Sequence, residues 1–232
     1  MMEQILYHHG LTRLTGLLVR PSGPAKAAVV VFPTIANVTP GIENRARMLA
    51  EQGYLALIGD FYGEQPASFE AARPLAMALR GDVDHYRARL TASVNALREH
   101  EAARGLPLAV IGYCMGGQAA LELARSGIDV ALAASFHGTL ETGRRADAPI
   151  IPRVLVCHGD ADPMVPREHV LALWQELDDV GANWHFHSYS GVKHGFTDPA
   201  SDARGMAAVA YNASADRQSW AALLAMMGEV FG

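Results

Sequence analysis

The sequence is poor in cysteine, with only Cys114 and Cys157 among its 232 residues. Two cysteines cannot build the disulfide framework of a small secreted domain, and these two form no CxxC redox motif. Cys157 lies inside an apolar segment, which is typical of a buried core thiol. Cys114 lies in a glycine-rich segment and needs a separate explanation.

Long hydrophobic runs and clusters of positive charge are also missing. No stretch of 18 apolar residues occurs, so no membrane-spanning helix is expected, and residues 1–4 do not begin a secretory signal peptide. The 24 acidic and 19 basic side chains give a net charge of −5 without a Lys/Arg cluster. We therefore expect a cytoplasmic protein that binds neither nucleic acid nor membranes.

Motifs for metals and cofactors are absent as well. The histidines show no ligand spacing such as HExxH, and no glycine-rich dinucleotide fingerprint occurs. We expect neither a metal nor a cofactor. Nothing in the sequence indicates an oligomeric state.

What the sequence does contain is an alternation of short apolar segments and longer helical patterns. Half of the residues are hydrophobic, and we expect residues 1–232 to form a single domain. The alternation is typical of an α/β fold, a mostly parallel, doubly wound sheet with helices on both faces. The expected strands are 4–9 and 14–19 as an edge hairpin, then 27–32, 55–60, 108–112, 130–136, 154–158 and 184–190. The expected helices are 41–52, 82–101, 118–125, 167–180 and 207–231.

The segment Gly-Tyr-Cys-Met-Gly-Gly at residues 112–117 has the pattern of a nucleophile elbow with cysteine in place of serine. In such an elbow a strand ends in a turn so tight that glycines must flank the nucleophile, and a helix begins behind it. The helix N-terminus favours an anion, so we expect the Cys114 thiol to ionise more readily than an ordinary buried thiol. The alternative is a structural cysteine in a glycine-rich turn of the kind that also binds phosphates.

Two further residues complete a triad at the ends of predicted strands, where an open parallel sheet binds its ligands. Asp162 and His194 each follow such a strand, and the chain order of nucleophile, acid and histidine is that of α/β-hydrolases. The imidazole would take the thiol proton, and the carboxylate would orient the ring. Asp160 is the rival acid. His137 and His158 are the rival bases, but neither follows the acid in the chain.

An acyl-transfer site also needs N–H groups that hold the oxyanion of the tetrahedral intermediate. In this fold one belongs to the residue after the nucleophile and the other to the loop after the first long parallel strand. These positions are Met115 and Ile35.

Residues 63–81 follow a strand end, contain two prolines and show a weak helical pattern. They form either a lid over the carboxyl ends of the strands or an ordinary surface connection.

These residues resemble the dienelactone hydrolase family, α/β-hydrolases with a Cys-Asp-His triad. The resemblance covers nearly the whole chain. It rests on the motif at 112–117, on residues 49–57 leading to Asp-Phe-Tyr-Gly at 60–63, on GxxDxxVP at 159–166, and on His-Gly-Phe at 194–196. It implies that Cys114 is the nucleophile, His194 the base and Asp162 its orienter, with the oxyanion amides on Ile35 and Met115.

Two departures from the family pattern bear on the substrate. Thr34 stands where dienelactone hydrolases have a glutamate beside the thiol, and a hydroxyl cannot accept the thiol proton at neutral pH. The arginine that follows the histidine motif in the family and helps to hold a substrate carboxylate is also missing, which argues against an anionic lactone. We expect Thr34, Tyr62, Arg80 and Phe196 to contact the substrate.

We therefore predict a hydrolase of small-molecule carboxylic esters or lactones that acts through a thioester at Cys114 without a cofactor. Two alternatives remain open. One is a binding or sensing module with little turnover, which would suit the loss of the glutamate. The other is an acyltransferase or amidase that uses the same triad.

Overall fold

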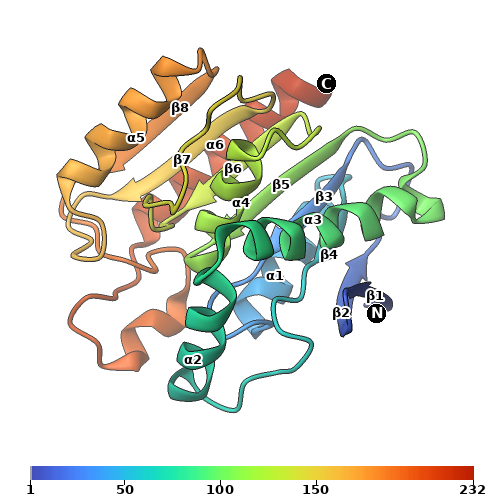
Figure 1. Ribbon diagram of the computed structural model, residues 1–232, viewed down its shortest axis with the longest axis horizontal. Coiled ribbons are helices and arrows are strands. Elements are labelled where there is room, and N and C mark those ends of the chain that lie inside the picture. Colours follow the sequence, from blue (N-terminus) through green and yellow to red (C-terminus); the bar gives the residue numbers. More distant parts are fainter. Residues whose placement is uncertain (1) are drawn as a thin grey trace.

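One mixed sheet of eight strands forms the centre of the protein, whose computed structural model describes residues 2–232 (Figure 1). The strand order is β1-β2-β4-β3-β5-β6-β7-β8. Strands β3 to β8 run parallel to one another, and β1 and β2 form the predicted antiparallel hairpin at one edge. The strands are β1 (Glu3–His9), β2 (Thr12–Val19), β3 (Ala28–Phe32), β4 (Leu55–Ile58), β5 (Leu108–Tyr113), β6 (Leu132–Phe136), β7 (Arg153–Gly159) and β8 (Trp184–Tyr189).

Helices cover both faces of this sheet, which confirms the predicted α/β architecture. One face is covered by α1 (Pro40–Glu51) and α6 (Ala213–Phe231), and the other by α2 (Phe69–Arg80), α3 (Val83–Glu99), α4 (Met115–Arg125) and α5 (Arg167–Asp179). In the part of the chain that the structure describes, no helix is long and apolar enough to cross a bilayer.

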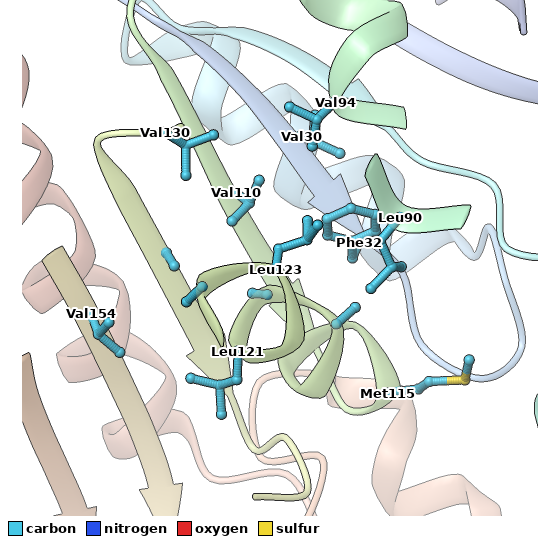
Figure 2. Close-up of a cluster of buried hydrophobic side chains, with 14 of the residues drawn as sticks. Val30, Phe32, Leu90, Val94, Val110, Met115, Leu121, Leu123, Val130 and Val154 are labelled. Atoms are coloured by element: carbon cyan, nitrogen blue, oxygen red, sulfur yellow. The ribbon is translucent and has the colours of Figure 1, made fainter. Parts of the chain in front are cut away.

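The central strands have side chains in two separate cores because successive residues of a strand point to opposite faces. In β3, Val29 and Val31 pack with α1 and α6, whereas Val30 and Phe32 pack with α3 and α4. Figure 2 shows this second core, where Leu90 of α3 lies close to Phe32. Each fully buried side chain of this size contributes about 1.5–3 kcal/mol. The apolar strands are thus held between two helical layers, which leaves their carboxyl ends for the site.

Two helices begin three or more residues away from the predicted start. Helix α4 begins at Met115 rather than residue 118, directly after the turn at Cys114. Helix α6 begins at Ala213 rather than residue 207, with the Asn212 side chain as its N-cap. The backbone before Asn212 is instead hydrogen-bonded to the loop that contains His194. The N–H of His194 donates to Ala208 O at 3.2 Å. A segment held in this bridge cannot also form helical hydrogen bonds.

The predicted lid segment, residues 63–81, contains helix α2. Ser68 caps its first turn by accepting a hydrogen bond from Ala71 N–H, and Pro74 lies within the helix. The weak helical pattern in residues 63–81 therefore corresponds to a helix, α2. That it moves as a lid stays a prediction.

Four buried charged side chains connect the helices on the α3 face. Glu122 of α4 accepts hydrogen bonds from Arg87 of α3 at 2.9 Å and from Arg125 at 3.0 Å. Arg125 also donates to Glu176 of α5 at 3.0 Å, and Glu176 accepts from Ala146 N–H at 2.8 Å. Because the charges alternate, each buried carboxylate faces a guanidinium. The network fixes α4, the helix behind Cys114, to both of its neighbours.

Removal of one member of this network should cost far more stability than removal of a surface ion pair. Arg125→Met takes a partner from both Glu122 and Glu176, which are buried, and should lower the free energy of unfolding by about 3–5 kcal/mol. Arg145→Met is the matched control, because its pair with Asp179 is exposed and should contribute about 0–1 kcal/mol. Urea unfolding of both variants measures the difference, and equal losses would contradict the prediction.

Candidate active site

The turn between β5 and α4 has the geometry of the predicted elbow. Cys114 has φ 57° and ψ −118°, a strained combination for a residue with a side chain. A Cβ on Gly112 would lie 1.9 Å from Gly116 O, and one on Gly116 would lie 2.1 Å from Phe32 O. Only glycine fits at these two positions, so the strand and helix approach closely enough to project Cys114 from the turn.

The structure brings Asp162, and not Asp160, to His194. His194 Nδ1 donates to Asp162 Oδ2 at 2.7 Å, and both side chains are buried. The other oxygen, Oδ1, accepts from Met164 N–H at 2.9 Å, which fixes the carboxylate. Asp160 is paired with Arg167 at the surface instead. The hydrogen bond to Asp162 places the second ring nitrogen of His194, Nε2, as a proton acceptor.

His194 Nε2 interacts with the half-buried thiol of Cys114. No hydrogen bond of good geometry is formed at this nitrogen within residues 2–232, and such bonds commonly tighten only when substrate binds. Burial lowers the pKa of His194, but the charge of Cys114 and the hydrogen bond to Asp162 raise it to about 10. Burial raises the pKa of Cys114, but the charge of His194 and the hydrogen bonds from His194, Met115 and Ile35 together lower it. The two groups therefore favour a thiolate–imidazolium pair.

Two backbone amides lie beside the same sulfur. The N–H groups of Met115 and Ile35 donate hydrogen bonds toward Cys114 and also lower the pKa of its thiol. Tyr62 fixes this arrangement, since its hydroxyl donates to Ile35 O at 3.1 Å and lies 3.4 Å from the Met115 sulfur. Tyr62 thus holds the loop that carries Ile35 and does not border the cleft, in contrast to its predicted contact with substrate.

Asp60, the first residue of the motif at 60–63, holds this loop in place by hydrogen bonds. Its carboxylate is buried and accepts hydrogen bonds from the Asn37 side chain and from the N–H groups of Thr15, Tyr62 and Gly63, each at 2.9 Å. The sequence marked Asp60 by its motif and by its position after strand β4, but gave it no role in the site. The carboxylate therefore links the edge hairpin to the loop that carries Ile35.

His137 occupies the space between the elbow and the loop of His194. Its Nδ1 accepts from Cys114 N–H at 3.1 Å, which places the ring hydrogen on Nε2, and this nitrogen donates to Thr197 Oγ1 at 2.9 Å. Its ring stands edge-on to that of His194, with centroids 5.1 Å apart. Burial and the charge of His194 hold the pKa of His137 well below its usual range. His137 is therefore neutral and positions the elbow against the loop of His194, a role different from that of the rival base expected from the sequence.

A cleft of about 500 Å³ opens beside Cys114 and His194. Thr34 and Arg80 border it, and their contact with substrate stays a prediction. Phe196 does not, because it is fully buried and packs on His137 and Tyr189, so its predicted contact with substrate is wrong. The other residues of the cleft wall are Ile35, Ala36, Phe69, Glu70, Met115, Thr139, Met164, Arg204, Met206 and Val209.

The 3₁₀-helix Pro199–Arg204 adds a residue that sequence reasoning missed. Arg204 reaches the cleft wall and is paired with Asp198. No motif marked it, because its place at the cleft depends on how the loop after His194 folds back. Over residues 2–232, no group of three or more His, Cys, Asp or Glu is arranged to hold a metal ion.

Comparison with known proteins gives a consistent result. The model of the dienelactone hydrolase family matches residues 14–231. A dienelactone hydrolase-like promiscuous phosphotriesterase from metagenomic libraries, P91, has 33% identity and a TM-score of 0.94, over 100% of this chain and 99% of that one. A solved structure named m3DLH has 38% identity and the same TM-score and coverage. Carboxymethylenebutenolidase 1 of Cupriavidus pinatubonensis is 28% identical over 82% of this chain and 83% of its own length.

The interaction of His194 with Cys114 predicts that the thiol ionises at a lower pH than an ordinary cysteine. Alkylation of Cys114 by iodoacetamide should proceed at pH values below the ordinary thiol range, because His194 lowers the pKa of Cys114. His194→Ala removes that charge, so the midpoint of the rate–pH curve should move to higher pH. Rates are measured in the Cys157→Ala background, where only one thiol remains. An unchanged midpoint in His194→Ala would show that the imidazole does not set the thiol pKa.

Proposed function

The chain belongs to the dienelactone hydrolase family, and we propose that it hydrolyses carboxylic esters or lactones through a thioester at Cys114. As a member of this family, the chain has the α/β-hydrolase fold and is a hydrolase of lactone or ester bonds. One observation carries the proposed mechanism. The strained Cys114, the His194–Asp162 pair and two backbone amides converge on one side of a cleft.

In the acylation step the Cys114 sulfur attacks the carbonyl carbon, and the carbonyl oxygen takes up the negative charge. The N–H groups of Ile35 and Met115 stabilise this oxyanion. The proton on His194 Nε2 then passes to the leaving oxygen, the carbon–oxygen bond breaks, and a thioester remains. Asp162 keeps the imidazole oriented and stabilises its charged form throughout.

In the second step His194, now neutral, accepts a proton from water while the water oxygen attacks the thioester carbon. The carbon–sulfur bond breaks, the carboxylic acid leaves, and the thiolate–imidazolium pair is restored. One ester and one water are consumed in each cycle.

Thr34 has a structural part in this scheme in place of the family glutamate. Its hydroxyl accepts a hydrogen bond from Ala36 N–H at 3.3 Å and so shapes the turn around Ile35. Proton acceptance rests on His194, whose pairing with Cys114 already favours the thiolate. The activity therefore does not require a carboxylate at position 34.

The cleft wall supports a substrate that is largely apolar with one anionic group. Phe69, Met164 and Met206 supply apolar surface, whereas Arg80 makes no ion pair within residues 2–232. Helix α2 thus brings the positive charge of Arg80 to the cleft, together with the negative charge of Glu70, although the family arginine after the histidine motif is missing. A carboxylate or a similar group on the substrate would face Arg80.

The nucleophile is tested by comparing the two cysteines. Cys114→Ala should lower kcat/KM for p-nitrophenyl acetate by about 10³-fold or more, as loss of a triad member typically does. Cys157→Ala should keep wild-type turnover, because its thiol is buried in β7, away from the cleft. Wild-type turnover in Cys114→Ala would overturn the thioester mechanism, and absent turnover in the wild-type protein would favour a binding module.

The orienting carboxylate is tested by a matched pair two residues apart. Asp162→Asn leaves the shape of the site but favours the wrong tautomer of His194, so kcat should fall by up to about 10⁴-fold. Asp160→Asn alters only an exposed pair with Arg167 and should leave kcat unchanged. Steady-state kinetics of both variants decide the matter, and a fall of similar size in both would contradict the assignment.

A further inference from the structure

A second, much smaller cavity borders the catalytic groups. It has a volume of about 30 Å³ and shares Thr34, Cys114, His194 and Arg204 with the large cleft. From there it extends toward the N-terminus of helix α1, where Thr39 and Gly41 border it. Since roughly 10–15 Å³ of such space holds one water, this cavity accommodates water and excludes an ester substrate. We call it the recess.

Three threonine hydroxyls in the recess wall have hydrogens left to donate. The hydroxyl oxygens of Thr34, Thr39 and Thr197 each accept one hydrogen bond from the protein. None of the three hydroxyls donates to a partner within the described range 2–232. A water oxygen accepts bonds of this kind, and a buried water typically makes about three hydrogen bonds. The wall of the recess therefore matches the hydrogen-bonding needs of water.

His194, the proposed base, borders the recess. Its Nε2 is buried, has no hydrogen bond of good geometry within residues 2–232, and belongs to a ring that borders the recess. The other nitrogen is committed to Asp162. A water in the recess thus lies beside both the base that would deprotonate it and the sulfur that carries the acyl group.

We propose that the recess is the binding site of the water that hydrolyses the thioester. This inference rests on the proposed role of Cys114 as nucleophile. The water oxygen forms a bond to the acyl carbon, one water proton goes to His194 Nε2, and the electron pair of the carbon–sulfur bond returns to sulfur. The leaving alcohol departs through the large cleft. The two reactants of the cycle therefore reach Cys114 from different cavities.

Gly41→Ala tests the recess by filling it. A Cβ on Gly41 lies 3.3 Å from Asp198 Oδ1, and both residues border the recess. Gly228→Ala in α6 is the matched control, because it is also a helical glycine and its added Cβ contacts nothing within 4 Å. In stopped-flow assays with p-nitrophenyl acetate, the initial burst reports acylation and the steady state reports turnover of the thioester.

Gly41→Ala should keep the rate of the burst and lower the steady-state rate by roughly tenfold or more, because the attacking water loses its position. Gly228→Ala should leave both phases unchanged. An unchanged steady state in Gly41→Ala overturns the recess proposal, as does an equal loss in both phases. Absence of a burst in the wild-type protein together with full activity of Cys114→Ala would instead refute the thioester mechanism on which the proposal rests.

When methanol is added, the thioester is attacked either by water or by methanol. The ratio of methyl ester to free acid is a second measurement, and it does not depend on the amount of folded protein. Methanol is too large for the filled recess and attacks from the cleft, so the ratio of methyl ester to free acid should rise in Gly41→Ala. It should stay at the wild-type value in Gly228→Ala. An equal ratio in all three proteins would show that water also arrives through the cleft.

Discussion

The close approach of helix α4 to strand β5 is the constraint on which the site depends. Gly112 and Gly116 leave no room for side chains, so the chain turns with Cys114 in the left-handed region. This geometry projects the sulfur from the sheet and points the first amide of α4 toward it. The strain is sustained because both elements are fully buried, with α4 also held by the alternating charges around Glu122.

The loops at the carboxyl ends of the strands are connected to one another as well as to the sheet. His137, itself at φ 40°, joins the elbow to the loop of His194 through its hydrogen bonds to Cys114 and Thr197. Asp60 and Tyr62 join the loop of Ile35 to the rest in a similar way. The relative positions of sulfur, imidazole and amides are thus set by side chains that lie outside the wall of the large cleft.

Of the three histidines His137, His158 and His194, only His194 has a raised pKa. Burial lowers the pKa of His137 and of His158, whereas His194 has the nearby thiol and carboxylate that raise its pKa. A charged His137 would oppose the imidazolium of His194 across 5.1 Å. A neutral His137 therefore favours the ion pair at Cys114.

The sequence by itself determined the parallel sheet, the elbow and the choice of Asp162 as the partner of His194, because each depends on local patterns of apolar residues, glycines and strand ends. It also placed Ile35 and Met115 correctly beside the sulfur. Only the tertiary structure decided that Phe196 is buried, that Tyr62 supports a loop, that His137 lies against Cys114 and that Arg204 reaches the cleft. These roles arise where loops from different strands meet, and spacing along one chain does not encode how far such loops fold toward one another.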